Sequence, residues 1–382
     1  MSDFIFRMSP NIILGSYSLS RLGQMALEYG TRYLVIMDPI LTDLNLAEKV
    51  TNSLDERKID CIKYGELTEG SSTKTIEIAL SLAREGHVHG VIAVGGKKAL
   101  NIGRAVAAFY NEIHDLYSFV DGATPNTTPL PCICVPSTYT YPFVFTNEIP
   151  VKDARSNRQV ILKVQPNICR LCLVDPNMML TFTKNQKMAI SLETIAMAME
   201  AYLSQKATFF SDMFVEKAMQ LISYGMDGSP TLEVTTPEEV LLTQAGCMAS
   251  VAAASSSLGV GSLLSLTINA RNRLSKPLIS AILLPYTIED AMKYKVDRLD
   301  KLAHILRYAD EDTHGEEAAQ AFAENVRQRL AQENMPARLK DLQLTMEQLA
   351  LCAEDAGQIE IVNKLPRSMT SDDLFEIIKT AY

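Results

Sequence analysis

Residues 191–204 read SLETIAMAMEAYLS, a stretch with helical spacing in the middle of a chain of 382 residues. Glu193 and Met197 are four residues apart, so an α-helix places both side chains on one face. The two side chains differ as metal ligands. A carboxylate binds divalent ions, whereas a neutral thioether is a poor ligand for a divalent ion that prefers nitrogen and oxygen donors. The segment therefore raises the question of whether this helix can bind a metal.

Short apolar segments alternate with amphipathic ones through the first half of the chain. Strands are expected at residues 33–37, 59–64, 90–94, 131–135 and 170–174, with helices at 46–56, 74–85 and 98–110. This alternation predicts a parallel sheet covered by helices. After Asp175 and Pro176 nearly every segment reads as helix. We therefore expect an α/β domain over residues 1–180 and an all-helical domain over residues 181–382.

The composition is that of a globular protein without a basic surface. Charged residues make up 21% of the chain and the net charge is −9, which argues against nucleic acid or an anionic membrane as a partner. Residues 240–270 carry no charged side chain, but they are rich in Ser, Thr, Gly and Ala, so a buried helix pair is predicted rather than a membrane span. The first residues contain no apolar run of signal length, and a cytoplasmic location is expected.

The seven cysteines are dispersed, as is typical of proteins in a reducing compartment. Cys132, Cys134, Cys169 and Cys172 have spacings that suggest a metal site at first sight. They lie in strand-like segments, however, where alternation of side chains between two faces keeps four thiolates from converging. Small buried core residues are the prediction.

Residues 90–94 run into Gly95 and Gly96, and a helical segment follows. A glycine turn between a strand and a helix directs backbone N–H groups and the positive end of the helix dipole at one point, which suits a phosphate. A tight turn without a ligand is the alternative. Asp38, at the end of an earlier strand, can bind a ribose hydroxyl pair or can simply open a turn before Pro39.

Together these segments resemble the iron-containing alcohol dehydrogenases, which are related to the glycerol dehydrogenase and dehydroquinate synthase-like fold. Residues 191–204 are similar to the family's metal-binding helix GMDALTHAIEAY, and the glycine turn is similar to its GGGSxxDxAK motif. Residues 10–15 and 363–374 also fit the family. The resemblance implies a Rossmann-like N-terminal domain, a helical C-terminal domain, a cleft between them, and metal-assisted hydride transfer between NAD(P) and an alcohol or aldehyde.

The resemblance places the family's four metal ligands at Glu193, Met197, Ser262 and Lys276. Of these, Glu193 alone could still bind a divalent cation, and a lysine ammonium would repel one. No metal is therefore expected. We predict instead that Lys276 pairs with Glu193, because a buried carboxylate needs a partner. The histidines occupy none of the four positions and are expected in surface or capping roles: His87, His89, His114, His304 and His314.

The resemblance also implies a set of dinucleotide-facing residues: Asp38, Gly95, Gly96, Lys97, Lys98, Asn101, Ser137 and Thr138. Lys97 and Lys98 replace a glycine and a serine of the family, which favours a pyrophosphate by charge but obstructs its approach to the backbone. Asn101 replaces a carboxylate that the family places near the nicotinamide. Residues 136–143, PSTYTYPF, replace the family's PTTAGTGSE and form either a new pocket with aromatic walls or a filled one.

Two functions are compatible with these substitutions. The first is a family member that has lost the metal-dependent step and binds a small molecule or a protein partner in the altered cleft. The second is an NAD(P)-dependent oxidoreductase that works without a metal, using Lys276 or a tyrosine of the loop as the electrophile or acid. NAD or NADP is the cofactor that the second function requires. A homodimer is expected by analogy with relatives alone.

Overall fold

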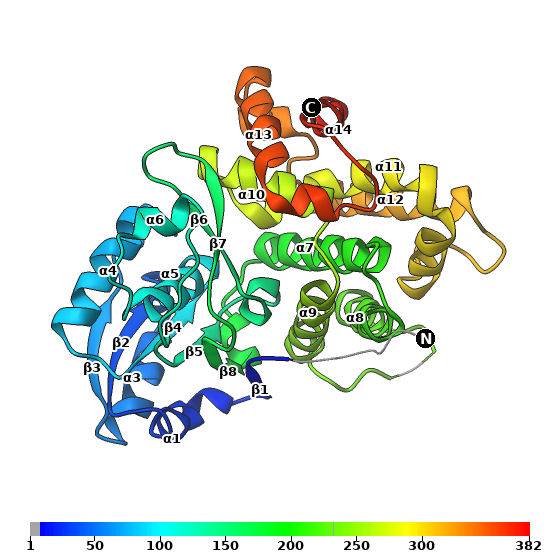
Figure 1. The fold of residues 1–382 in the computed structure, drawn as a ribbon. Coiled ribbons are helices and arrows are strands. Elements are labelled where there is room, and N and C mark those ends of the chain that lie inside the picture. Colours follow the sequence, from blue (N-terminus) through cyan, green and yellow to red (C-terminus); the bar gives the residue numbers. More distant parts are fainter. Residues whose placement is uncertain (1–7, 232) are drawn as a thin grey trace, which may run out of the picture. The chain divides into compact units, whose positions relative to one another are not determined.

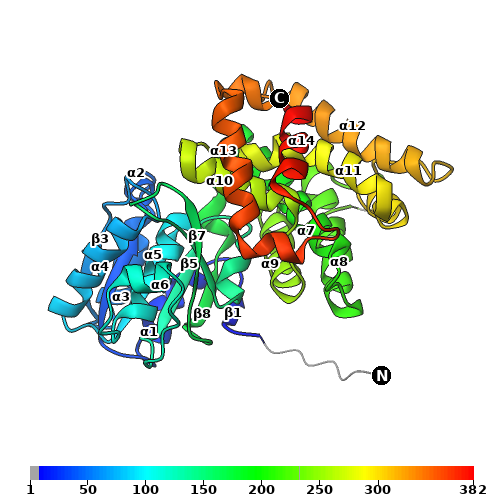
Figure 2. The ribbon, with the colours of Figure 1, turned by 45° about the horizontal axis from the view of Figure 1, so that its top comes forward.

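The computed structural model describes residues 8–231 and 233–382 and divides the chain into two compact units, Met1–Thr181 and Phe182–Tyr382. The first unit, here called unit 1, combines a parallel sheet with helices, and the second, unit 2, is helical. Figures 1 and 2 show unit 1 in blue to green and unit 2 in green to red. The predicted fold class is confirmed for both units.

In the described part of unit 1, six parallel strands form one sheet in the order β1-β8-β5-β4-β2-β3. The strands are β1 (Asn11–Leu14), β2 (Arg32–Met37), β3 (Asp60–Tyr64), β4 (Gly90–Gly95), β5 (Cys132–Pro136) and β8 (Cys169–Val174). Both central strands, β4 and β5, are buried along their whole length, as the unbroken apolar runs predict for a sheet covered on both faces.

The helices of unit 1 follow the strands. They are α1 (Leu22–Ala26), α2 (Ile40–Asp43), α3 (Ala47–Asp55), α4 (Thr73–Glu85), α5 (Lys97–Phe109) and α6 (Leu116–Val120). Short 3₁₀ segments lie at Ser18–Arg21, Pro142–Phe145 and Pro176–Met179. Helix α5 begins directly after β4 and packs on β4 and β5, so its first turn lies at the carboxyl end of the central strands.

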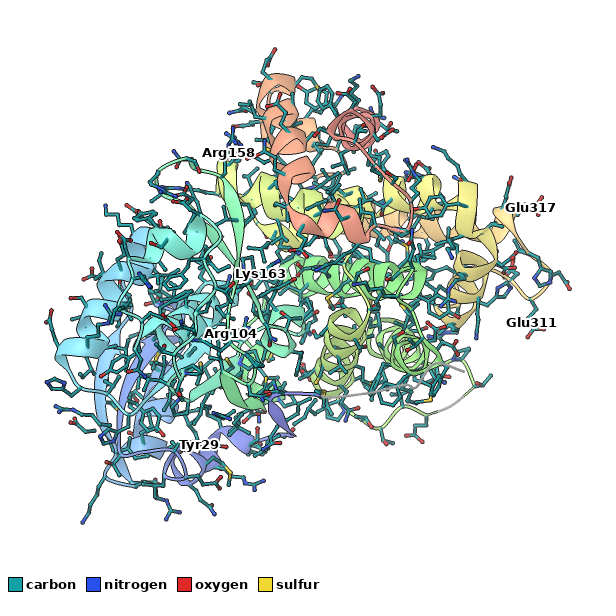
Figure 3. The ribbon with its side chains drawn as sticks, viewed as in Figure 1. Tyr29, Arg104, Arg158, Lys163, Glu311 and Glu317 are labelled. Carbon is teal, nitrogen blue, oxygen red and sulfur yellow. The ribbon has the colours of Figure 1, made fainter. Side chains whose placement is uncertain are left out.

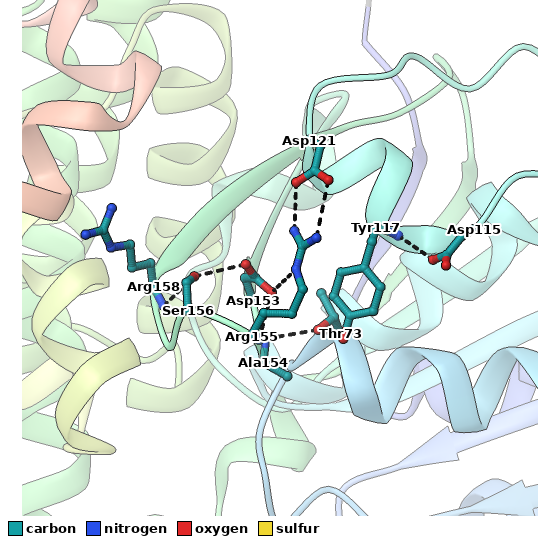
Figure 4. A network of polar contacts seen from close by, with 9 residues as sticks. All are labelled: Thr73, Asp115, Tyr117, Asp121, Asp153, Ala154, Arg155, Ser156 and Arg158. Atoms are coloured by element: carbon teal, nitrogen blue, oxygen red, sulfur yellow. Dashed lines mark hydrogen bonds and ion pairs between the residues drawn. The ribbon is translucent and has the colours of Figure 1, made fainter.

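Unit 1 also contains an antiparallel hairpin of β6 (Glu148–Lys152) and β7 (Gln159–Lys163). The sequence pattern does not predict it, because Pro150 interrupts the first strand and a proline argues against a central strand position. Arg155 in the hairpin turn pairs with Asp121 at 2.7 Å, and its guanidinium lies 4.3 Å from the centre of the Tyr117 ring (Figure 4). These contacts hold the hairpin turn against α6.

The other end of the hairpin is held by Arg104 of α5, which is labelled in Figure 3. Its side chain is 1% exposed, and its guanidinium donates to the carbonyls of Thr146 at 2.6 Å and Glu148 at 3.1 Å. A buried guanidinium is stable only with such acceptors. Helix α5 and the hairpin therefore form one packed layer.

The four cysteines of β5 and β8 are buried, as predicted, and all seven cysteines are free thiols. They are less separated than the alternation of a strand suggests. The Sγ atoms of Cys132 and Cys134 are 3.9 Å apart, and the thiol of Cys169 also interacts with Cys134. Contact with the other two thiols keeps the pKa of Cys134 well below its usual value.

Several helices of unit 2 pack on α7. The helices are α7 (Lys184–Leu203), α8 (Phe209–Asp227), α9 (Glu238–Ser255), α10 (Val260–Asn272), α11 (Lys276–Ile305), α12 (Glu316–Gln332), α13 (Met346–Gln358) and α14 (Ser371–Ala381). Every residue of α7 from Ala189 to Leu203 is buried. A charged residue on this part of α7 therefore needs a partner from a neighbouring helix.

The uncharged residues 240–270 form α9 and α10, which confirms the predicted helix pair. Most of the side chains on both helices are buried. Among the described residues, no single helix has the length and apolar composition of a membrane span, and α9 and α10, bent by 100° at their junction, meet that test only as a pair.

Candidate functional site

The carboxyl ends of β2, β4 and β5 meet at one edge of the sheet in unit 1. The N–H of Asp38 donates to the carbonyl of Val94 at 3.0 Å, and the N–H of Ser137 donates to the carbonyl of Gly95 at 2.9 Å. An ideal Cβ on Gly96 would lie 3.6 Å from Oδ2 of Asp38, so the carboxylate lies beside the glycine turn. The structure thus brings together four of the predicted residues: Asp38, Gly95, Gly96 and Ser137.

The glycine turn continues into the first turn of α5, whose N-cap is Gly96. Gly96 has no side chain to accept from the first N–H groups of the helix, and those groups are suited to an anion. Lys97 is half-buried and Lys98 is exposed at the same helix end. Both interpretations of Asp38, a turn before Pro39 and a ribose-binding carboxylate, agree with the structure. Its carbonyl accepts from Leu41 N–H at 3.0 Å in a turn, and its carboxylate lies beside Gly96.

Gly95 cannot be replaced without strain, and Gly95→Ala is expected to lower the free energy of unfolding of unit 1 by about 3 kcal/mol. Its φ is +139°, and an added Cβ would lie 2.6 Å from the Cβ of Asp38. Chemical denaturation of parent and variant measures the loss. Gly122→Ala is the matched control, because Gly122 has φ +108° with nothing within 4 Å of the added Cβ. Equal losses in both variants would show that contact with Asp38 contributes nothing.

Asn101 and the aromatic loop turn into the interior of unit 1. Asn101 is 4% exposed, its amide donates to the carbonyl of Pro150 at 2.8 Å, and its Oδ1 accepts from the hydroxyl of Tyr141. Burial raises the pKa of Tyr141, which opposes ionisation of the phenol. Tyr139 and Phe143 are each 3% exposed, and Thr138 is also buried. In unit 1 these side chains fill space, which supports the filled alternative for the loop.

The predicted ion pair between Lys276 and Glu193 is confirmed in unit 2. The Nζ of Lys276 lies 2.8 Å from Oε1 of Glu193, and the two side chains are 13% and 4% exposed. Lys276 is the first residue of α11, where the helix dipole disfavours a cation. Glu193 of α7 offsets that cost, and Lys276 in turn neutralises a carboxylate on a fully buried stretch of helix.

Sequence reasoning missed a second buried carboxylate, Glu200, which lies two turns beyond Glu193 on the same face of α7. Its two oxygens accept from the N–H of Gly259 at 3.0 Å and the N–H of Ser262 at 2.8 Å. Glu200 therefore caps the start of α10. Burial raises its pKa, against the hydrogen bonds from Ser262 and Gly259 and the charge of Lys276, which lower it.

The signal that could have revealed Glu200 is the spacing of two glycines at the start of α10. A Cβ on Gly259 would lie 2.7 Å from Cγ of Glu200, and a Cβ on Gly261 would lie 3.1 Å from its Oε1. Both glycines leave room for the glutamate. Glu200 links two of the predicted positions, because the N–H of Ser262 donates to it and the charge of Lys276 lowers its pKa.

The side chains at these positions are a poor set of ligands for a divalent metal. Met197 is 3% exposed and offers a thioether. Ser262 binds Glu200 through its N–H and its hydroxyl. Lys276 holds its ammonium 2.8 Å from Glu193, whose carboxylate a cation would require. Lys276 therefore presents an ammonium held against the Glu193 carboxylate, and its charge also lowers the pKa of Glu200.

Comparison with known proteins shows which family shares the fold of this chain. The sequence profile of the iron-containing alcohol dehydrogenases matches residues 9–176, and that of the family's C-terminal domain matches residues 187–382. The lactaldehyde reductase of Escherichia coli (strain K12) is 22% identical over 91% of both chains. The NAD-dependent methanol dehydrogenase of Bacillus methanolicus is 22% identical over 98% of this chain and 99% of its own.

Solved structures agree. The fold is similar to that of a 1,3-propanediol oxidoreductase, with a TM-score of 0.90 and 18% identity over 100% of both chains. It is also similar to that of an alcohol dehydrogenase from Oenococcus oeni, with a TM-score of 0.88 and 20% identity over 100% of both chains. The two profiles together cover nearly the whole sequence. The chain therefore belongs to the iron-containing alcohol dehydrogenase family.

Proposed function

We propose that this protein binds the ADP portion of a nucleotide in unit 1 and does not catalyse metal-assisted hydride transfer. The observation that carries the proposal is the 2.8 Å contact between Lys276 Nζ and Glu193. An ammonium at this distance competes directly with a divalent cation for the carboxylate. Restoring a metal would require removing Lys276 from a position where it is largely buried.

Two features of unit 1 support a retained nucleotide site with a lost nicotinamide site. The glycine turn, the start of α5 and Asp38 are arranged as a phosphate and ribose would need them. Asn101 and Tyr141, by contrast, satisfy one another in the interior. One relative is named as NAD-dependent, which supports a nucleotide of this class as the ligand.

The geometry disfavours the alternative, a metal-independent oxidoreductase. Lys276 would have to release Glu193 before its ammonium could polarise a carbonyl. The raised pKa of Tyr141 makes its phenol a poor proton donor near neutral pH, because general acids work best when their pKa is close to the ambient pH. Neither Lys276 nor Tyr141 is therefore suited to donate a proton to, or polarise, the carbonyl oxygen of a substrate.

Calorimetric titration with ADP-ribose and with NADH tests the binding proposal. We expect the two ligands to bind with dissociation constants within about threefold of one another, because the nicotinamide adds little where Asn101 and Tyr141 are paired. Asp38→Ala should weaken both by roughly tenfold or more, as expected for a lost hydrogen bond to a charged group. Asp43→Ala, an exposed acid nearby on α2, is the matched control. Absence of binding by either ligand contradicts the proposal.

Turnover assays test the loss of metal chemistry. With lactaldehyde, methanol and 1,3-propanediol as substrates, we expect no oxidation or reduction of NAD(H) with or without added Fe²⁺ or Zn²⁺. The positive control restores the family's ligands in one variant: Glu193→Asp, Met197→His, Ser262→His and Lys276→His. That variant should bind Fe²⁺ at these four positions, which the parent should not. Metal-stimulated turnover by the parent would show the proposal to be wrong.

A further inference from the structure

Far along α11 from the Lys276–Glu193 pair, three side chains with metal-ligating atoms lie together. Asp300 and His304 are four residues apart near the end of α11, and His314 lies in the connection between α11 and α12, residues 306–315. One ligand atom from each of the three lies within 4.8 Å of the others. We call them the Asp300 cluster. It is the one group of this kind found among residues 8–231 and 233–382.

Both ring nitrogens of His304 face oxygen atoms. Nδ1 lies 2.8 Å from Oδ1 of Asp300 and 2.9 Å from the Asp300 carbonyl, and Nε2 lies 3.2 Å from the carbonyl of Asp310. A neutral imidazole has one N–H and cannot satisfy acceptors on both sides. The ring therefore needs a positive charge at Nδ1, supplied either by a second proton or by a metal ion.

Asp300 arranges the other members of the cluster. Its Oδ2 accepts from the N–H of Gly315 at 3.0 Å and lies 3.9 Å from Nδ1 of His314. The His304 and His314 rings are stacked, with centroids 5.3 Å apart and planes 27° from parallel. A single dication shared by the two rings satisfies both and the carboxylate.

We propose that Asp300, His304 and His314 bind a divalent transition-metal cation of the zinc class, which ties the end of α11 to the connection leading into α12. Two imidazoles and a carboxylate are the donors that Zn²⁺, Cu²⁺ and Ni²⁺ accept in proteins. Three protein ligands leave a fourth position of a tetrahedral site to water. Neither the nucleotide site nor the Lys276–Glu193 pair includes any of these residues.

The geometry needs little adjustment to hold a zinc ion. Ligands about 2.1 Å from a tetrahedral centre are about 3.4 Å apart. Asp300 lies 2.8 Å from His304 through Oδ1 and 3.9 Å from His314 through Oδ2, which brackets that separation, and all ligand atoms of the cluster lie within 4.8 Å of one another. With Nδ1 of His304 on the metal, its Nε2–H donates to the Asp310 carbonyl, the outer hydrogen bond that metal-bound histidines usually make.

The surroundings favour a cation. The connection carries Asp310, Glu311 and Asp312, all exposed, and α12 begins with Glu316 and Glu317. Figure 3 labels Glu311 and Glu317 at this end of unit 2. A cluster of acids raises the local concentration of cations. Hydrogen bonds to the Asp300 oxygens and the Asp310 carbonyl raise the pKa of His304 above its usual value.

Titration of the untagged full chain with Zn²⁺ by calorimetry tests the proposal. We expect one saturable site, and Zn²⁺ should also raise the thermal unfolding midpoint, because a ligand that binds the folded state stabilises it. His314→Gln should weaken binding by at least roughly tenfold, as should His304→Gln. His314 is 69% exposed, so its replacement leaves the fold intact. Circular dichroism without metal checks this.

Two controls locate the ion. His114→Gln replaces an exposed histidine elsewhere, and Glu193→Gln removes the carboxylate of the buried ion pair, and neither should change the affinity for Zn²⁺. The chain has five histidines, so side-chain NMR signals should show two of them shifting on Zn²⁺ addition. The proposal is overturned if the parent shows no saturable binding. It is equally overturned if the His304→Gln, His314→Gln double variant binds Zn²⁺ as tightly as the parent.

Discussion

Replacement of Lys276 by methionine is expected to lower the free energy of unfolding of unit 2 by about 3 kcal/mol. Glu193 is 4% exposed and lies on a helix surrounded by other helices, so loss of the ammonium leaves its charge in a poorly solvated position. Removal of a cation from the first residue of α11 returns part of this loss, at most about 1 kcal/mol. Urea denaturation followed by far-ultraviolet circular dichroism measures the change.

A double-mutant cycle separates the pair from its surroundings. Glu193→Leu combined with Lys276→Met should lie within about 1 kcal/mol of the parent, because hydrophobic residues often replace a buried ion pair without loss. The matched surface pair is Lys379 and Glu376, whose side chains are 44% and 68% exposed. Lys379→Met should cost less than about 1 kcal/mol. If the losses of the two single core variants simply add in the double variant, the pair is not coupled.

Replacement of Glu200 by alanine should also cost about 3 kcal/mol or more. The change removes the acceptor for the N–H groups of Gly259 and Ser262 and leaves a cavity beside the two glycines of α10. Glu200→Gln keeps the volume but turns an amide N–H₂ toward one of those donors, so a smaller loss is expected. Glu354→Ala, an exposed glutamate on α13, is the control and should change stability by no more than about 0.5 kcal/mol.

The stability difference between the parent and Glu200→Gln should depend on pH. The pKa of Glu200 is raised in the folded protein, first by burial, so the ionised form costs stability above that pKa. As the pH falls through the folded pKa toward the unfolded value, the cost is relieved. The advantage of the parent over the glutamine variant should therefore grow from pH 8 to pH 5. An advantage that stays constant or shrinks over that range contradicts a raised pKa.

Periodicity predicted the strands β2, β3, β4, β5 and β8 of the sheet and the helices α3, α4 and α5, whereas the segment of β1 was reached through the resemblance to the family. The parallel strands are continuous apolar runs because both faces of the sheet are covered, and such runs are visible without any knowledge of contacts. The predicted strand at 90–94 is β4, Gly90–Gly95, and the predicted helix at 98–110 is α5, Lys97–Phe109. The hairpin of β6 and β7 was not predicted, because Pro150 within β6 argues against a strand in the sequence pattern. The hairpin is held by hydrogen bonds from Arg104, a distant residue on α5.

The ion pair of Lys276 and Glu193 could be predicted although the residues are 83 positions apart. The prediction rested on two points. The family's fold brings both positions to one metal site, and a buried carboxylate needs a partner, for which Lys276 was the available cation. The same reasoning did not reach Glu200, because its partners are backbone N–H groups and the two glycines at the start of α10 mark only the space that its side chain needs. Helix spacing places Glu200 on the same face of α7 as Glu193, but only the tertiary structure shows that Glu200 caps the start of α10.

The sequence by itself determined the order of strands and helices along the chain and the position of the glycine turn, because these follow from local periodicity and residue type. The substituted ligand positions came from the resemblance to the family. Tertiary structure alone decided which polar groups satisfy one another. The pairing of Asn101 with Tyr141 and the convergence of Asp300, His304 and His314 depend on the path of loops in space. A polar group that is removed from water needs a hydrogen-bond partner from the protein, and the fold determines which group lies close enough to be that partner.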